Sequence, residues 1–169
     1  KVRRAQQKPV NKPDEEWPGW DQSEPLDDIE KKRFQSVAAF LNFSALDRPE
    51  LLYAVKELMR KMAKPTKADD TGLKRVIRFI RTLPRLVATY RWGPLPTDIE
   101  VFADSDHAGC PLTRRSTLGG CILWGGHYLK GWSQTMEIIA FSSGESELGA
   151  LVRGCAEGLG VQSILADFD

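Results

Sequence analysis

The chain has 169 residues, of which 41% are hydrophobic and 28% are charged, values that are ordinary for a soluble globular protein. No apolar stretch approaches the length of a transmembrane helix and no signal-peptide pattern opens the chain, so we expect no membrane span. The three cysteines form no C-x-x-C pair. They favour free thiols in a reducing, intracellular compartment, cytoplasmic or nuclear, without specifying which.

The net charge of +1 conceals an asymmetry along the chain. Residues 56–91 contain eleven Lys or Arg and three Asp or Glu, whereas residues 137–169 contain six acidic residues and one Arg. A basic block before an acidic one suits a protein that binds a polyanion with one part and cations with another. The charges alone leave a second interpretation open, in which both blocks are solvated helix faces.

The amino-terminal part is expected to be extended and then helical. Residues 1–26 carry four prolines and no periodicity, which predicts an arm or linker. A first helix is predicted over 28–44 because its apolar residues recur at helical spacing. These residues are Phe34, Val37, Ala38 and Leu41.

Two further helices are predicted before Pro84. The segment Asp47–Glu50 has the form of a capping box and would begin the second helix. We expect its core-facing residues to be Leu51, Val55, Leu58, Met59 and Met62. The third helix follows Pro65 and ends at Pro84, with one apolar and one basic face. Its inward residues would be Leu73, Val76, Ile77 and Ile80, and its basic residues are Lys74, Arg75, Arg78 and Arg81.

From residue 85 the pattern changes to the alternation of strands. Strands are predicted over the ranges 86–92, 99–105, 116–124 and 127–133, with a short apolar run at 138–141 that continues or adds an edge. The pair Gly125-Gly126 predicts a tight hairpin between the last two strands. A final helix over 143–165 can be capped by Ser142 and Glu145. We expect its buried stripe to consist of Leu148, Leu151, Val152, Cys155 and Leu159.

The predicted fold is therefore mixed α/β (α+β), with a boundary between residues 92 and 99. A small helical module occupies 27–92, and a unit of three antiparallel strands and a helix occupies 98–169.

Acidic residues occur at two places where the predicted elements end or begin. Asp104 and Asp106 stand at the end of a strand before a glycine-containing turn, a position that holds carboxylates rigidly enough for Mg²⁺. The alternative is a turn stabilised by local Asp and Ser hydrogen bonds. Glu147 lies beside the predicted stripe of the last helix and can reach toward the sheet, or it is a solvated surface residue. Glu145 is better explained as a helix cap.

Taken in order, several segments resemble the ribonuclease H region of copia-type retrotransposon polyproteins. They are VFADSDHAG at 101–109, TRRST at 113–117, GWS at 131–133 and FSSGESELGA at 141–150. Upstream, FQSVAAFL at 34–41, RPELLYAV at 48–55 and KRVIRFI at 74–80 are similar to the carboxy-terminal part of the family's reverse transcriptase. The resemblance covers about residues 33–165. It implies that residues 98–169 are the first half of a ribonuclease H-like domain.

This resemblance implies a two-metal nuclease that cleaves the RNA strand of an RNA–DNA hybrid with Mg²⁺ or Mn²⁺. By position, Asp104 and Glu147 match catalytic metal ligands of the family, and Asp106 is an outer candidate. The basic residues Lys74, Arg75, Arg78 and Arg81 would contact phosphates.

The chain departs from the family pattern in ways that limit this expectation. The family's third ligand lies in a later D-N-x-x-A motif that is not matched here, and the polymerase Y-x-D-D motif is also absent. We therefore expect this chain to be inactive alone, with the first strand exposed as an edge that a protein partner would cover. The alternative is a non-enzymatic structural or nucleic-acid-binding subunit of a larger assembly.

Overall fold

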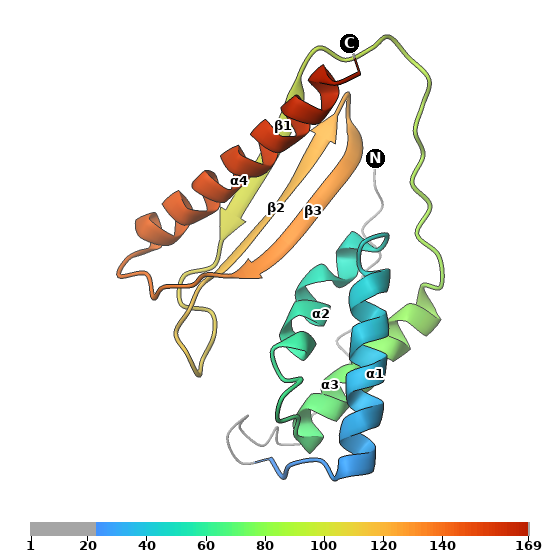
Figure 1. Cartoon of the computed structure of the whole chain (residues 1–169), viewed down its shortest axis with the longest axis vertical. Coiled ribbons are helices and arrows are strands. Elements are labelled where there is room, and N and C mark those ends of the chain that lie inside the picture. Colours follow the sequence, from blue (N-terminus) through green and yellow to red (C-terminus); the bar gives the residue numbers. More distant parts are fainter. Residues whose placement is uncertain (1–22, 169) are drawn as a thin grey trace.

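A computed structural model describes residues 23–168 and contains a helical module followed by a three-stranded sheet with one helix, as predicted (Figure 1). The elements in chain order are α1 (Asp28–Ser44), the 3₁₀ helix η1 (Pro49–Leu51), α2 (Leu52–Met59), α3 (Lys67–Thr82), β1 (Ile99–Ser105), β2 (Thr117–Trp124), β3 (His127–Thr135) and α4 (Ser143–Ala166). Of the helices in this described part, none has the length and apolarity to span a membrane.

The helical module encloses its own apolar core. Its buried residues come from every helix of the module: Phe34, Ala38, Leu41, Leu51, Val55, Leu58, Leu73 and Val76. Asp27 caps α1 by accepting a hydrogen bond from the Glu30 amide at 2.7 Å. Thr66 and Asp69 form a reciprocal capping box at the start of α3. Both helices therefore begin where local side-chain hydrogen bonds satisfy their free amides.

The predicted arm falls mostly outside the described residues, since 1–22 are not described. Its last residues pair with the connection between α2 and α3. Pro25 forms an isolated bridge with Thr66, and the Leu26 amide donates to the Pro65 carbonyl at 3.0 Å.

Two details of the helical prediction are wrong. Asp47 and Glu50 form no capping box, because the chain enters a 3₁₀ turn in which Arg48 occupies the cap position without a side-chain hydrogen bond to the helix. Glu50 instead accepts a hydrogen bond from the Arg48 side chain. Ile77 is exposed rather than inward, and Phe79 packs against the core in its place.

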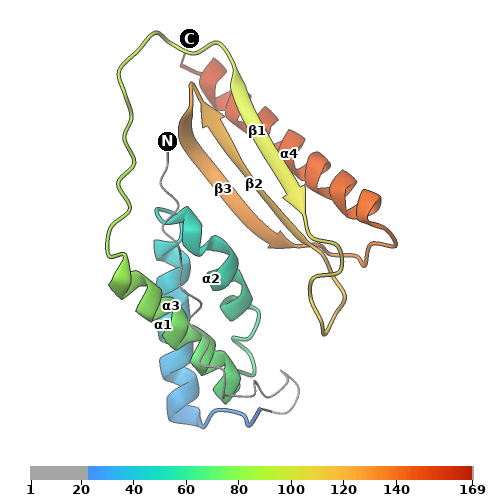
Figure 2. The same ribbon diagram turned by 180° about the vertical axis from the view of Figure 1, so that it is seen from behind.

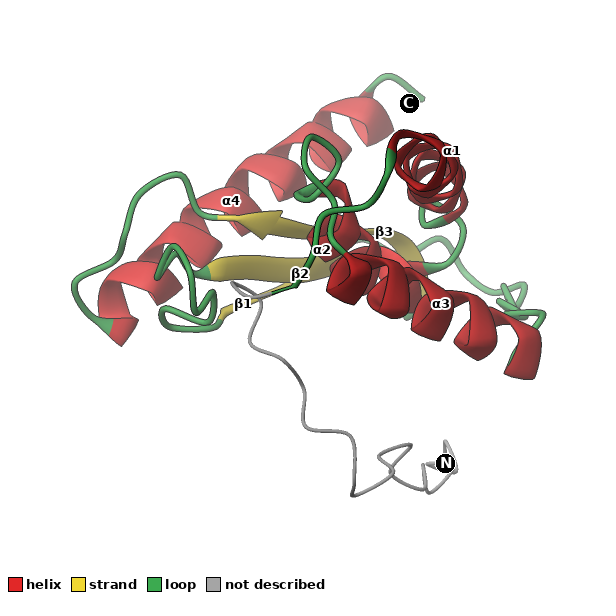
Figure 3. Ribbon diagram, turned by 90° about the horizontal axis from the view of Figure 1, so that it is seen from below, coloured by secondary structure: helices red, strands yellow, loops and turns green. Residues whose placement is uncertain are grey.

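The sheet is antiparallel with the order β1-β2-β3. Gly125 and Gly126 join β2 to β3 with φ values of +56° and +76°, the left-handed conformation that the two-glycine turn requires. α4 packs along β1 and β2, and Figure 2 views the sheet from its other face with α4 behind it. The helix α2 contacts β3, and Figure 3 shows the helical module beside the sheet.

Two segments predicted as strands are irregular. Residues 86–92 are exposed and lie in a stretch from 83 to 98 without regular structure, because no neighbouring strand accepts their backbone hydrogen bonds. Residues 138–141 likewise form no strand.

The prediction that α4 buries its large apolar residues against the sheet is wrong. The buried residues of α4 are small: Ser146, Ala150, Gly154 and Gly158. Leu148, Leu151, Val152 and Leu159 are all more than half exposed. A Cβ at Gly154 would lie 3.0 Å from the Cβ of Ala103, so only a small-residue face permits this close approach to β1.

Candidate functional site

Asp104 lies at the carboxyl end of β1, an edge strand of the described sheet. Val101 and Ala103 contact the glycines of α4. Because side chains alternate across a strand, Asp104 leaves the face of the sheet opposite α4. One of its carboxylate oxygens accepts the adjacent Ser105 amide at 2.8 Å. The other carries no hydrogen bond among the described residues and is available to a ligand.

Asp104 borders a hollow of about 550 Å³ between the sheet and the start of α2. Residues 119–121 and Gly131 form part of its floor, and Leu52 and Tyr53 form its roof. A Cβ at Gly131 would lie 2.6 Å from the Tyr128 hydroxyl and 3.3 Å from Leu52, so glycine keeps this floor open. Burial, followed by the charges of Glu57 and Asp106, raises the pKa of Tyr53.

A second hollow of about 590 Å³ follows the exposed edge of β1, and it also includes Asp104. Leu151 and Cys155 line it from α4. Glu147 is exposed and stands one turn before Leu151 on the same flank of the helix. Glu147 thus flanks the edge at β1 on the α4 side of the sheet, whereas the Asp104 side chain leaves the opposite face, so the two carboxylates approach this edge from different faces. No hydrogen bond or ion pair joins the two in the part of the chain that is described.

Asp106 forms its hydrogen bonds within the connection between β1 and β2. Its Oδ1 accepts the Thr117 amide, and its own amide donates to the Thr117 carbonyl at 3.1 Å. A Cβ at Gly109 would lie 2.0 Å from the Asp106 carboxylate, so the carboxylate rests on this glycine. This geometry is the local hydrogen bonding that the sequence allowed as the alternative explanation for Asp106.

The donor set is too small for a two-metal centre. Among residues 23–168 no cluster of three or more His, Cys, Asp or Glu is placed to hold a metal. Asp104 and Glu147 offer hard carboxylate oxygens of the kind that Mg²⁺ and Mn²⁺ prefer. Two carboxylates do not offset the repulsion of two adjacent dications, so these residues fit a partial site that needs further ligands.

The basic residues of α3 lie on its exposed side, but they are not equivalent. Lys74 forms an ion pair at 2.6 Å with Asp70, a buried carboxylate that also binds Arg33 at 3.2 Å. Its charge is therefore largely balanced within the protein. Arg78 and Arg81 are exposed and lie further along the same helix.

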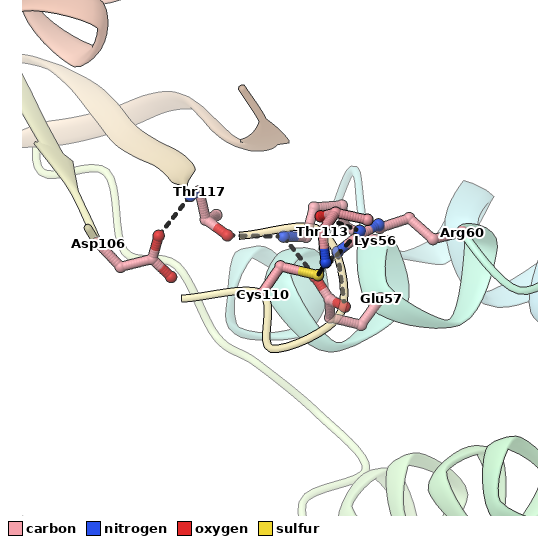
Figure 4. Close-up of polar contacts among 7 residues, drawn as sticks. All are labelled: Lys56, Glu57, Arg60, Asp106, Cys110, Thr113 and Thr117. Carbon is pink, nitrogen blue, oxygen red and sulfur yellow. Dashed lines mark hydrogen bonds and ion pairs between the residues drawn. The ribbon is translucent and has the colours of Figure 1, made fainter. Parts of the chain in front are cut away.

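One polar cluster that joins the two halves of the chain has no signal in the sequence (Figure 4). Lys56 donates to the Thr117 hydroxyl at 3.0 Å, and Arg60 donates to the Cys110 sulfur at 3.2 Å. Burial alone would raise the pKa of Cys110, but hydrogen bonds from Thr113 and Arg60 outweigh it and lower that pKa to about 7. Partners separated by fifty or more positions in the chain have no local pattern that predicts them.

Comparison with known proteins places the chain among mobile-element sequences. It is 25% identical over 134 residues to the retrovirus-related Pol polyprotein from transposon RE1 of Arabidopsis thaliana, covering 79% of the chain and 9% of that protein. It is 30% identical over 81 residues to the uncharacterized mitochondrial protein AtMg00240 of the same plant, covering 48% of the chain and 72% of that protein. These similarities support an origin from a retrotransposon polyprotein.

A third relative shares a higher identity with this Pol-related chain. The uncharacterized mitochondrial protein AtMg00810 of Arabidopsis thaliana is 35% identical over 125 residues, which cover 73% of the chain. The chain spans about half of that relative, 51% of its length. No family model and no solved structure matches the chain. The predicted origin from a retrotransposon polyprotein is confirmed, whereas the copia type and the exact domain portion stay predictions.

Proposed function

We propose that this Pol-related chain joins the carboxy-terminal part of a copia-type reverse transcriptase to the first half of a ribonuclease H-like domain. In the longer protein, Asp104 and Glu147 would serve as metal ligands for two-metal hydrolysis of RNA in an RNA–DNA hybrid. When bound, Mg²⁺ or Mn²⁺ would supply charge stabilisation and activate water. The described residues alone supply too few ligands for turnover.

The observation that carries this proposal is the shared edge of the sheet. Asp104 lines the hollow beside β1 together with Leu151, and Glu147 precedes Leu151 by one turn of α4. Both carboxylates are anchored on regular elements, which limits their motion as a metal site requires. Asp106 contributes by shaping the loop after β1.

The exposed arginines of α3 support the nucleic-acid part of the proposal. Arg78 and Arg81 present guanidinium groups that can bind phosphates in any sequence. Arg75 lies on the same exposed side. Lys74 contributes less, because Asp70 already neutralises it.

The direct test uses a protein that carries this chain together with its downstream sequence. Asp104→Asn keeps the side-chain shape and removes a charged ligand, so we expect hybrid cleavage to be lost while the circular-dichroism spectrum is unchanged. Asp98→Asn, at an exposed carboxylate just before the opposite end of β1, is the matched control and should keep the wild-type cleavage rate. Cleavage by the Asp104→Asn protein at the wild-type rate would refute the assignment, as would Mg²⁺-dependent turnover by the 169-residue chain alone.

A second function, as a non-enzymatic subunit of a larger assembly, is supported by the exposed edge strand β1. Phe102 is 54% exposed on this edge, and Leu151 of α4, which is 57% exposed, lines the same hollow. Unpaired strand edges bind other chains readily. We expect Phe102→Lys to reduce self-association measured by light scattering, and an unchanged mass distribution would count against a partner at this edge.

A further inference from the structure

The stretch from 83 to 98, called here the connecting segment, joins α3 to β1 and carries large side chains in solvent. Its exposed apolar and aromatic residues are Leu83, Leu86, Val87, Tyr90, Trp92 and Leu95. Trp92 is 102% exposed, so its whole ring is accessible. Exposing an indole ring in this way is costly in water, which points to a ligand that covers it.

The start of the connecting segment is fixed to the helical module. The Arg48 guanidinium donates to the Leu83 carbonyl at 2.8 Å and to the Pro84 carbonyl at 3.4 Å. These bonds hold the chain where it leaves α3.

The second half of the segment is fixed to the β2–β3 hairpin. The Tyr90 hydroxyl donates to the Tyr128 carbonyl at 3.0 Å, and the His127 ring contacts the Arg91 carbonyl at 3.2 Å. The rings of Tyr90 and His127 are 5.4 Å apart. The two residues before Trp92 are therefore held against the hairpin. This restraint reduces the conformational entropy that is lost when a ligand binds to Trp92.

Basic residues predominate in this part of the chain. Between Asp70 and Asp98 there are six Lys or Arg and no acidic residue. Arg85 and Arg91 lie within the connecting segment, and the remaining four lie on α3. A basic strip thus runs from α3 into the segment that carries Trp92.

We propose that the connecting segment binds single-stranded nucleic acid, with Arg85 and Arg91 on phosphates and an unpaired base stacked on Trp92. Proteins that bind single strands combine basic grooves with exposed aromatic rings in this way. A base inside a duplex is already stacked on both sides and does not cover the ring. This inference extends the proposed contact of α3 with nucleic acid, and it does not depend on the metal site.

The arrangement favours a polyanion over a protein partner. A protein that covered Trp92 would also have to neutralise the guanidinium groups of Arg85 and Arg91, neither of which has an acidic residue within six positions in the chain. A phosphate backbone neutralises them and supplies the stacking surface at the same time.

The test measures binding of the full chain to a short fluorescein-labelled oligothymidylate, alone or annealed to an RNA complement, by fluorescence anisotropy. Trp92→Ala should weaken single-strand binding about 5- to 150-fold, the range expected for one stacked base. Trp92→Phe should recover most of this loss. Phe141→Ala, which removes another exposed aromatic ring, is the matched control and should have no effect.

A salt titration tests the phosphate contacts. Replacing both Arg85 and Arg91 with Gln should reduce the slope of log affinity against log salt by about 0.7 per lost contact. Lys32→Gln, on the exposed surface of α1, should leave that slope unchanged.

Several results would overturn the inference. One is an unchanged single-strand affinity in Trp92→Ala, and another is an equal loss for the single strand and the hybrid. Trp92-dependent binding to anionic vesicles without oligonucleotide binding would assign the surface to a membrane instead. If Arg78→Gln with Arg81→Gln leaves hybrid binding intact while Trp92→Ala weakens single-strand binding, the proposed role of α3 fails and this inference stands.

Discussion

Substituting Gly154 with Ala tests how α4 packs on the sheet. An added Cβ would lie 3.0 Å from the Cβ of Ala103 and 3.3 Å from Cγ1 of Val101. The Ala103 Cβ is fixed to the backbone of β1 and cannot rotate away. Gly160 provides the control, since it lies in the same helix and a Cβ there has no atom within 4 Å.

The magnitude follows from two opposing effects. Replacing Gly with Ala inside a helix stabilises it by about 0.8–1.0 kcal/mol. Overpacking against a fixed neighbour costs roughly 1–3 kcal/mol. Gly160→Ala should therefore raise the free energy of unfolding by about 1 kcal/mol. Gly154→Ala should be less stable than Gly160→Ala by roughly 1–3 kcal/mol, because the helix-propensity gain cancels in this comparison.

Urea unfolding followed by far-ultraviolet circular dichroism measures both variants against the wild type. Leu151→Ser provides a second check, because the predicted stripe would make it a core residue whereas the structure leaves it 57% exposed. If Gly154→Ala is as stable as Gly160→Ala while Leu151→Ser is strongly destabilised, α4 packs through its leucines and the placement of Glu147 is wrong.

Two predictions concern titratable groups. In a chain with Cys121 and Cys155 replaced by Ser, the rate of Cys110 alkylation should rise with pH, with a midpoint near pH 7. Arg60→Gln should move this midpoint to higher pH, because it removes a hydrogen bond to the Cys110 sulfur. An unchanged midpoint would exclude the Arg60 contact. The hydrogen bond from Lys130 lowers the pKa of Glu157 despite partial burial, and Arg153 adds to this. Because the folded pKa lies below the ordinary value of 4.5, this stabilisation is present above that pH and is lost as the pH falls through the folded pKa. Glu157→Gln should therefore lower the free energy of unfolding by about 1 kcal/mol at neutral pH and by progressively less in acid. A difference in urea midpoints between variant and wild type that does not change with pH would contradict this.

Local patterns predicted those parts of the fold that local interactions determine. α1 occupies 28–44 as predicted, because the Asp27 cap and the apolar spacing act within the same segment. The Gly125-Gly126 turn formed because both positions require positive φ.

The sequence failed where distant packing decides the outcome. Hydrophobicity assigned Leu148 and Leu151 to the core, yet the distance of closest approach between α4 and β1 selects Gly154 and Gly158 instead. Residues 86–92 alternate like a strand, but a strand also needs a neighbour, which periodicity does not reveal. At the site, motif resemblance nominated Asp104 and Glu147 as metal ligands, which stays a prediction. The two hollows depend on how the helices lie against the sheet, which no local motif reveals.

The most direct test of the central claim is Mn²⁺ titration of the ¹⁵N-labelled chain observed by NMR. Paramagnetic broadening should affect the amides around Asp104 and around Glu147 together at low Mn²⁺, and Asp104→Asn should abolish it at both places. Broadening that spares either position, or that survives in Asp104→Asn, would show that the two carboxylates do not share a cation and would contradict the proposed origin of the site.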